Sequence, residues 1–337
     1  MNWLERLTGF RETSYDETRA RLAVSEGRLY SKVNGKSWAV GELQVASLQS
    51  LRERAAAAGA PRGRPRLSIV EGDVRKLHRA AEYEGALFQV ASQFNALEMT
   101  SPASTPEHGV AGYEHDHTQG PACAIAAGAA TIYRNYFAAV AGGLGQTKDR
   151  QIDGLADLGA ALSAALDRTA GSLWSMRNGY AMCTAEGLNA IADHLTRLSA
   201  EDADVLRARL SIVVQSGVEL TEAATPGRLA SQAFCSALPV AYVGLPKAPW
   251  APFATLVLEA AYEATLWAAA INAAECGSDI VLLTLLGGGA FGNDDRWIFQ
   301  GLRRALEKAE GFDLDVRIVS YGSPQRQIRE FVRNWTI

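Results

Sequence analysis

The feature that most constrains the fold is a cluster of glycines between an apolar run and a helical pattern. The apolar run covers 280–285, residues 286–293 read Leu-Gly-Gly-Gly-Ala-Phe-Gly-Asn, and the helical pattern extends from about Asp294 to about Glu310. A buried strand followed by glycines and a helix start is typical of anion sites in α/β proteins. Glycines let backbone N–H groups approach a phosphate, and the helix N-terminus adds positive partial charge. A tight turn without a ligand is the alternative explanation of this segment alone.

Composition bounds the class of protein. The chain has 337 residues, 48% of them hydrophobic and 21% charged, and a net charge of −4. A sizeable core is therefore available, and a broad nucleic-acid-binding face is not expected. The N-terminus lacks a signal-peptide core, and no stretch has the composition of a membrane span. We expect a soluble cytoplasmic protein, or one delivered to a host cytosol, with no nucleic-acid or membrane partner. The oligomeric state cannot be predicted.

The cysteines carry a second expectation about compartment. Cys123, Cys183, Cys235 and Cys276 are widely spaced and lie in apolar contexts. This usage predicts buried free thiols in a reducing compartment.

The pattern of elements predicts an N-terminal accessory region, residues 1–63, and a larger α/β region, residues 64–337. In the accessory region we expect a helix over 15–23, a hairpin around Asn34-Gly35 and a helix over 45–58. The larger region alternates strands with helices, which predicts a mixed sheet with helices on both faces. Its expected strands are 67–70, 86–91, 210–214, 233–242, 280–285 and 316–321. Its expected helices include 121–140 and 254–274, with a helical insertion at about 145–230.

Polar residues follow three of the predicted strands. Ligands of open α/β sheets bind beyond the carboxyl ends of strands. The first end carries Gly72-Asp73-Val74, the second carries Asn95 and Glu98 and leads to Gly109-Val110, and the third is the glycine loop. Asp73 can accept a hydrogen bond from an exocyclic amine such as that of adenine. It can equally cap a helix that begins near Val74.

In order and placement these three segments resemble the macrodomain family of ADP-ribose-binding proteins. The resemblance covers roughly 67–145 and 232–322. The chain departs from the family in the loop Ser92-Gln93-Phe94-Asn95, which lacks the usual alanines and following glycines, and in the long insertion. The segment 113–124, Tyr-Glu-His-Asp-His-Thr-Gln-Gly-Pro-Ala-Cys-Ala, looks more like the MavL-like effector-type ADP-ribosyl hydrolases. That branch is implied to remove ADP-ribose from arginine with acidic side chains and without a metal or another cofactor.

The resemblance implies a role for each matching residue. Asp73 would bind the adenine amine, the backbone N–H of Val74 would contact the ring, and Tyr321 would flank it. Asn95 would hold the distal ribose, and Gly109 and Val110 would form one phosphate wall. The diphosphate would be wrapped by Gly287, Gly288, Gly289, Ala290, Phe291, Gly292 and Asn293, with Phe291 shielding it or stacking on the distal ribose.

Hydrolysis of an N-glycosidic bond needs a carboxylate that activates water or stabilises the oxocarbenium-like ribose. A carboxylate can also hold the guanidinium of a substrate arginine. Glu98 and Asp116 are the first candidates, and Glu107 is the third. His115 and His117 flank Asp116 and raise a metal site as an alternative, although no other cluster completes a ligand set.

Three functions are consistent with these residues. The leading hypothesis is an ADP-ribosyl hydrolase that acts on ADP-ribosylated protein, with arginine as the modified residue. The second is a non-catalytic ADP-ribose reader, and the third is a nucleotide-binding α/β protein with unrelated chemistry.

Overall fold

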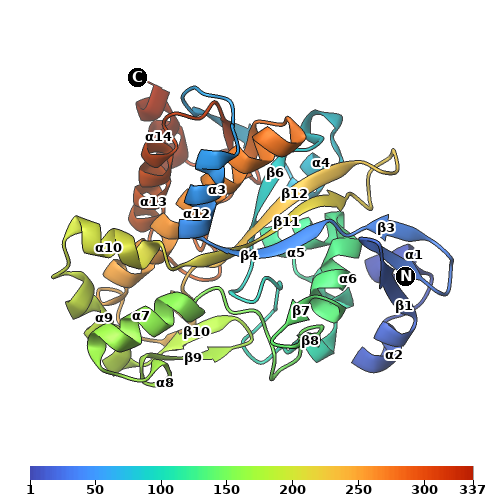
Figure 1. Cartoon of the computed structure of the whole chain (residues 1–337), viewed down its shortest axis with the longest axis horizontal. Coiled ribbons are helices and arrows are strands. Elements are labelled where there is room, and N and C mark those ends of the chain that lie inside the picture. Colours follow the sequence, from blue (N-terminus) through green and yellow to red (C-terminus); the bar gives the residue numbers. More distant parts are fainter. Residues whose placement is uncertain (337) are drawn as a thin grey trace.

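A seven-stranded mixed sheet forms the centre of the computed structural model, which describes residues 1–336 (Figure 1). Ile337, the last residue of the expected larger region, lies outside the described residues. In spatial order the strands are β4 (Glu42–Ser47), β11 (Ser211–Glu219), β12 (Leu229–Cys235), β6 (Leu87–Ala91), β13 (Ile280–Leu283), β14 (Asp315–Ser320) and β5 (Arg66–Glu71). The five strands from β12 to β5 are parallel, and β11 runs antiparallel to both of its neighbours.

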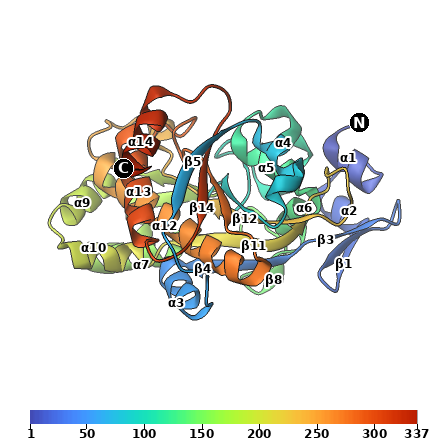
Figure 2. The same cartoon turned by 90° about the horizontal axis from the view of Figure 1, so that it is seen from above.

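Helices cover both faces of the sheet, as the sequence predicts (Figure 2). The side chains of β6 alternate between the two faces: Leu87 packs with the α12 side and Phe88 with the α5 side. One face carries α3 (Leu48–Ala57), α7 (Ala156–Leu166), α9 (Ala185–Leu195), α10 (Ala200–Arg207), α12 (Trp250–Cys276), α13 (Asp295–Lys308) and α14 (Arg326–Thr336). The other carries α4 (Val74–Arg79), α5 (Gln119–Ala126) and α6 (Gly128–Tyr136).

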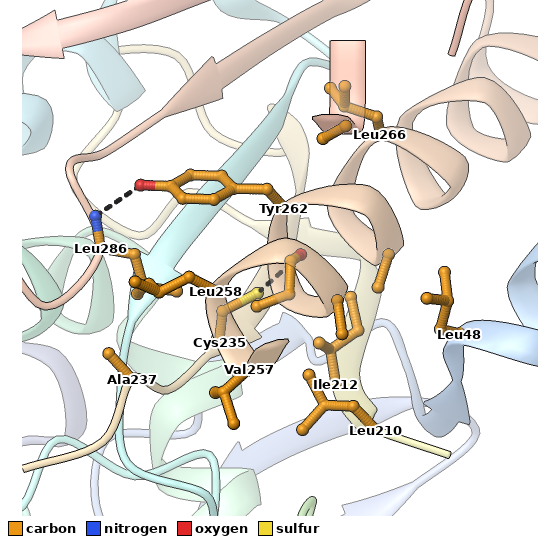
Figure 3. Close-up of a cluster of buried hydrophobic side chains, with 14 of the residues drawn as sticks. Leu48, Leu210, Ile212, Cys235, Ala237, Val257, Leu258, Tyr262, Leu266 and Leu286 are labelled. Atoms are coloured by element: carbon orange, nitrogen blue, oxygen red, sulfur yellow. Dashed lines mark hydrogen bonds between the residues drawn. The ribbon is translucent and has the colours of Figure 1, made fainter. Parts of the chain in front are cut away.

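Helix α12 is the centre of the larger core. The helix has 27 residues and is long and apolar enough by composition to span a membrane, although it includes Glu259, Glu263 and Glu275. In the fold, 89% of its most apolar window is buried. A helix that is apolar on all sides belongs in a protein interior or a membrane, and here its neighbours supply the interior. Figure 3 shows Val257, Leu258 and Tyr262 of this helix packed among side chains of the sheet and the following loops.

Two peripheral parts flank the sheet at opposite ends of the view in Figure 1. The N-terminal part contains α1 (Trp3–Thr8), α2 (Tyr15–Ala20), β1 (Leu22–Ser25), β2 (Arg28–Ser31) and β3 (Ser37–Ala39). The expected hairpin around Asn34-Gly35 is confirmed as the antiparallel pair β2–β3. The other part includes α7 to α10, with α8 at Ala170–Leu173, and the hairpin β9 (Trp174–Arg177) and β10 (Tyr180–Cys183). A small pair, β7 (Ala139–Val140) and β8 (Gly143–Leu144), precedes it.

The structure differs from several expected boundaries. Residues 42–57 form β4 and α3, which belong to the central sheet and its covering layer, not to a separate accessory region. Strand β11 lies within the expected insertion but pairs with β4 and β12. The helix expected over 121–140 breaks at Ala127, and the strand expected over 233–242 ends at Cys235 and is followed by the short helix α11 (Val240–Val243). The local pattern of apolar and polar residues in these segments did not reveal where pairing with distant strands begins or stops.

The sheet opens between β6 and β13 at its carboxyl edge. These strands pair at Leu87 and Phe88 of β6 and no further along β6. The side chain of Gln119 occupies part of the gap, because it accepts a hydrogen bond from Ala91 N at 2.8 Å and donates one to Gln89 O at 2.8 Å. The side chain of Gln89 reaches the other strand and accepts from Thr284 N at 3.2 Å. This opening is where the candidate site lies.

Candidate functional site

Two adjacent pockets follow the carboxyl edge of the parallel strands. The first, of about 510 Å³, lies at the ends of β5 and β14, and the second, of about 280 Å³, lies at the ends of β6, β12 and β13. They share the lining residues Asp116, Thr118, Gln119, Thr284 and Leu285. The pair therefore forms an elongated site across the opening of the sheet, with space for an extended ligand.

Asp73 lines the first pocket and also caps α4. It can therefore cap the helix and contact a ligand at the same time. Its Oδ1 accepts a hydrogen bond from Arg75 N at 2.9 Å, which completes the first turn of α4. Its Oδ2 accepts no hydrogen bond from residues 1–336. Val74 follows in the pocket wall, and its N–H, the first of the helix, has no acceptor in the same part of the chain. Tyr321, 85% exposed, lines the same pocket from the end of β14.

The glycine loop lies at the second pocket, which is lined by Gly287, Gly289, Ala290 and Phe291. A backbone φ of 76° at Gly287 is left-handed, and a Cβ there would lie 2.5 Å from the Cβ of Ala237. The loop closes where Asn293 N donates to Gly287 O at 3.0 Å. In the described chain, the N–H groups of Gly289, Ala290 and Phe291 have no acceptor. These three donors at the pocket suit an anionic ligand.

The other predicted loop residues shape the turn without lining either pocket. Gly288 N donates to Leu285 O at 3.1 Å, and Gly292 N donates to Gly289 O at 3.0 Å. The side chain of Asn293 is buried and donates to Leu238 O at 2.8 Å, so it ties the loop to the segment after β12. A hydrogen bond joins the start of the loop to the core, because Leu286 N donates to the hydroxyl of Tyr262 on α12 at 2.7 Å (Figure 3).

The N-terminus of α13, which follows the glycine loop, does not supply the positive partial charge expected there. Asp294 caps α13 by accepting from Arg296 N at 3.0 Å. The hydrogen bond from the Arg296 side chain lowers the pKa of Asp294 to about 2, so this carboxylate is charged at neutral pH. The N-terminus of α5 takes that place, since Thr118 and Gln119 line both pockets and no side chain caps the helix. A Cβ on Gly120 would lie 2.0 Å from Ala91 O, so glycine is required for α5 to lie this close to β6.

An aromatic cluster covers the outer side of the glycine loop. The rings of Tyr180, Tyr242 and Phe291 lie with centroids 5.3 to 5.5 Å apart. Tyr180 comes from the hairpin β9–β10 of the insertion, is 1% exposed, and donates from its hydroxyl to Met99 O at 2.7 Å. Ala241 N donates to Phe291 O at 3.0 Å, which links α11 to the loop. The insertion thus braces the second pocket.

Of the three predicted acids, only Asp116 lies at the pockets. It lines both of them, and its Oδ1 accepts from Thr118 N at 2.9 Å, which sets the chain direction into α5. No other carboxylate in residues 1–336 lines the second pocket. Asp116 has no salt-bridge partner in the same range.

Glu98 is a buried ion-pair residue and does not line either pocket. It is 2% exposed and lies beneath Gly120, with its carboxylate 3.4 Å from the guanidinium of Arg134. Burial raises the pKa of Glu98 to about 7, and the charge of Arg134 opposes that rise. Arg134 is fully buried, donates to Ala96 O and Gln215 Oε1 at 3.0 Å, and lies over the ring of Phe234. The structure therefore places Glu98 away from both pockets, contrary to the expectation that it faces the ligand.

Other predicted residues also lie away from the pockets. Glu107 accepts from the backbone N–H of Lys148 at 2.9 Å in a separate loop. Asn95 is buried and accepts from Leu97 N at 3.0 Å, so its side chain stabilises its own loop. Gly109 and Val110 face the N-terminal part, where Val110 N donates to Glu12 at 3.0 Å. Sequence proximity to a strand end placed these residues at the site, but the loop between β6 and α5 carries them elsewhere.

The histidines of the alternative metal site and the four cysteines can also be placed in the structure. His115 and His117 are exposed, and across residues 1–336 no group of three or more His, Cys, Asp or Glu side chains could hold a metal ion. Cys123, Cys183 and Cys235 are buried free thiols, as expected, whereas Cys276 is exposed at the end of α12.

Several pocket residues did not stand out in the sequence. Gln119 lies inside the quoted 113–124 segment, but its bridging role depends on β6, some thirty residues earlier. Thr284 lies one residue beyond β13 and was counted within the apolar run. Tyr180 follows Asn178-Gly179, which separates β9 from β10. No signal in the sequence connects that turn with Phe291, more than one hundred residues later.

Comparison with known proteins finds similarity among solved structures alone. No family model matches the sequence, and no curated protein matches it significantly. Among solved structures, a poly(ADP-ribose) glycohydrolase from Deinococcus radiodurans in complex with ADP-ribose has 13% identity and a TM-score of 0.45, covering 87% of this chain and 94% of that one. The poly(ADP-ribose) glycohydrolase from Thermomonospora curvata has 13% identity and a TM-score of 0.44, covering 96% of both chains.

Proposed function

We propose that this protein binds ADP-ribose in the two adjacent pockets and hydrolyses the bond between ADP-ribose and a modified protein side chain. One observation carries the proposal. A carboxylate oxygen of Asp73 that accepts no hydrogen bond from residues 1–336 lies at one end of an elongated site. The amides of Gly289, Ala290 and Phe291, which have no acceptor in the same residues, lie at the other end. The first group suits an exocyclic amine and the second suits a diphosphate.

The two pockets divide the ligand between them. Adenosine fits the first pocket, with its amine at Asp73 and its ring beside Tyr321. The diphosphate then crosses the shared wall, where the uncapped first turn of α5 supplies further N–H groups. The distal ribose reaches the second pocket, next to Phe291 and the brace formed by Tyr180.

Catalysis would depend on Asp116. Cleavage of a glycosidic bond develops positive charge at the anomeric carbon, and a carboxylate either stabilises that charge or activates the attacking water. Asp116 is the one carboxylate that lines the second pocket in residues 1–336. It needs no metal for either role.

Arginine is the substrate side chain that we propose. The guanidinium of a modified arginine is a cation in the substrate, and it leaves as a guanidine that takes up the proton released by the attacking water. Asp116 is a pocket carboxylate with no ion-pair partner within the described residues. A planar guanidinium can form two hydrogen bonds with such a carboxylate. The bond cleaved would be N-glycosidic.

Calorimetry with ADP-ribose, and with AMP as the comparison ligand, tests the binding site first. Micromolar binding of ADP-ribose with much weaker binding of AMP is the expected result, because AMP leaves the second pocket empty. Equal affinities would favour a nucleotide-binding protein with unrelated chemistry, and no binding of ADP-ribose would refute the proposal.

Hydrolysis of arginine-linked ADP-ribose tests the reaction. In Asp116→Asn the amide oxygen can still accept from Thr118 N, so the start of α5 is retained while the charge is lost. We expect turnover to fall by a factor of about 100 to 10,000 with little change in ADP-ribose affinity. Glu107→Gln is the matched control, since Glu107 lies outside both pockets.

A reader module is the second candidate, and one observation favours it. Two of the three predicted acids, Glu98 and Glu107, do not line the pockets, which leaves a single carboxylate for chemistry. If wild-type protein binds ADP-ribose but releases none from arginine-linked or serine-linked substrates, the reader is the better description.

A further inference from the structure

A third cavity, of about 210 Å³, lies between the N-terminal part and α5. Its walls come from α1, the β2–β3 hairpin, α5 and the segment after β11, and include Trp3, Arg6, Lys36, Trp38 and Ile125. Only Ile125 also lines the first pocket. The proposed function does not use this cavity.

The hydrogen-bonding groups left free in this cavity are donors. Lys36 is exposed and forms no salt bridge within the described chain. Trp38 is 8% exposed, and its indole N–H has no acceptor in residues 1–336. Arg6 adds a third donor group, although it already contacts Met1 O at 2.8 Å and Glu114 at 2.9 Å.

The acceptors of the cavity are already engaged. The carboxylate of Glu222 accepts from the guanidinium of Arg75, with one contact of 2.6 Å. The hydroxyl of Thr221 accepts from Gly128 N at 3.1 Å. The charges of Arg6 and Glu222 are each balanced by an ion-pair partner, Glu114 and Arg75. A ligand that enters therefore meets Lys36 as the cation without an ion-pair partner in residues 1–336, together with the N–H of Trp38.

The rest of the lining is apolar. Trp3 is 3% exposed, and Leu7 and Ile125 complete the floor. Burying apolar ligand surface against these side chains would add to binding. The fitting ligand is thus an anion attached to an apolar or ring-bearing group.

We infer that this cavity binds a phosphate monoester carried by such a group. A phosphate offers three acceptor oxygens, which matches the donors of Arg6, Lys36 and Trp38 better than a carboxylate with two. The inference goes beyond the proposed function and does not require it.

Two ion pairs connect this cavity with the first pocket. Arg6 lines the cavity while its partner Glu114 lines the pocket, and Glu222 lines the cavity while its partner Arg75 lines the pocket. The phosphate could therefore belong to a nucleotide bound in the first pocket or to a separate molecule. Both sources present the same chemistry to Lys36 and Trp38.

Titration of the full-length protein with phenyl phosphate tests the site. Lys36→Ala should weaken binding about tenfold, the loss of one charged hydrogen bond, and Trp38→Phe should weaken it about threefold. Lys32→Ala is the matched control, because Lys32 lies on the same hairpin, donates to Ala20 O at 2.9 Å and does not line the cavity. Lys36 is exposed, so its substitution leaves the fold intact.

Absence of phenyl phosphate binding, or binding equally strong in Lys36→Ala and the wild type, would overturn the inference. A comparison of 2′-phospho-ADP-ribose with ADP-ribose identifies the source of the phosphate. A gain in affinity that Lys36→Ala removes assigns the phosphate to the nucleotide, and no gain beside intact phenyl phosphate binding assigns it to a separate molecule. Failure of ADP-ribose to bind would count against the proposed function alone, because phenyl phosphate reports on the third cavity.

Discussion

Asp73 provides the sharpest test of the binding site, because its two carboxylate oxygens have different tasks. Oδ1 caps α4 through Arg75 N, whereas Oδ2, at the first pocket, has no hydrogen-bond donor among residues 1–336. Replacement by asparagine leaves one oxygen for both tasks. If that oxygen caps the helix, an NH₂ group faces the adenine amine. If it faces the amine, the helix loses its cap.

The magnitudes of the two losses differ. A hydrogen bond to a charged group contributes about 1.5–3 kcal/mol, so loss of the contact with adenine should weaken ADP-ribose binding by about 10-fold to 150-fold. Asparagine and aspartate are nearly equal as N-caps, whereas loss of a cap costs about 1 kcal/mol. We expect Asp73→Asn to keep the cap, and so to bind weakly while unfolding at nearly the wild-type free energy.

Calorimetry with ADP-ribose and urea unfolding of the same samples measure both quantities. Asp73→Ala lacks both oxygens and should lose affinity and about 1 kcal/mol of stability together. Wild-type affinity and wild-type stability in Asp73→Asn would refute the reasoning, since one oxygen cannot fulfil both tasks.

Three further predictions concern the loop, the brace and a buried histidine. Gly287→Ala should lower the free energy of unfolding by about 1–3 kcal/mol because of its left-handed backbone and its contact with Ala237, whereas Gly289→Ala, with no atom within 4 Å of the added methyl, should unfold like the wild type in urea. Tyr180→Leu removes the ring contact with Phe291 and should raise the Kd for ADP-ribose about tenfold while leaving AMP unaffected, as calorimetry would show. Burial lowers the pKa of His78 from 6.5 to about 4, so the unfolded chain binds a proton first as the pH falls, and the stability present above pH 6.5 should decrease by about 3 kcal/mol by pH 4. Urea unfolding across this pH range should show a smaller decrease in His78→Gln, and an unchanged slope in that variant would contradict the assignment.

The sequence predicted the elements with strong local signals. The Asn34-Gly35 hairpin, the β13–loop–α13 unit and the mixed sheet with helices on both faces are all present. The predicted element boundaries were wrong where the secondary structure of a segment depends on pairing with a strand far away in the sequence. Strand β4 becomes a strand by pairing with β11, about 170 residues later, and its own residues Glu42–Ser47 have no regular alternation.

Apart from Asp116, the predicted site residues that line the pockets have one feature in common, which is that each lies soon after the end of a strand. Asp73 lies two residues after β5, Gly287 and Phe291 belong to the loop that follows β13, and Tyr321 is the next residue after β14. The positions of residues farther from the end of their strand could not be predicted from the sequence, because the sequence does not reveal the path of the intervening loop. Asn95 turns back to hold its own loop through Leu97 N, at a point where Ala96 adopts a left-handed φ of 57°.

The contrast between Glu98 and Asp116 shows what decides whether an acidic residue of a loop reaches the pocket. Both acids lie between β6 and α5, and nothing in their local sequence separates a catalytic carboxylate from a buried one. Gly120 lets the first turn of α5 approach Ala91 O so closely that Glu98 is left beneath the helix, where Arg134 balances its charge. Asp116 precedes that turn and stays at the pocket wall. Charge at the second pocket therefore depends on one residue of the loop, and its shape depends on the brace from the insertion. Substitution of Asp116 should lower turnover, and substitution of Tyr180 should lower affinity. A variant of Asp116 that loses both turnover and affinity would indicate that the carboxylate positions the ligand.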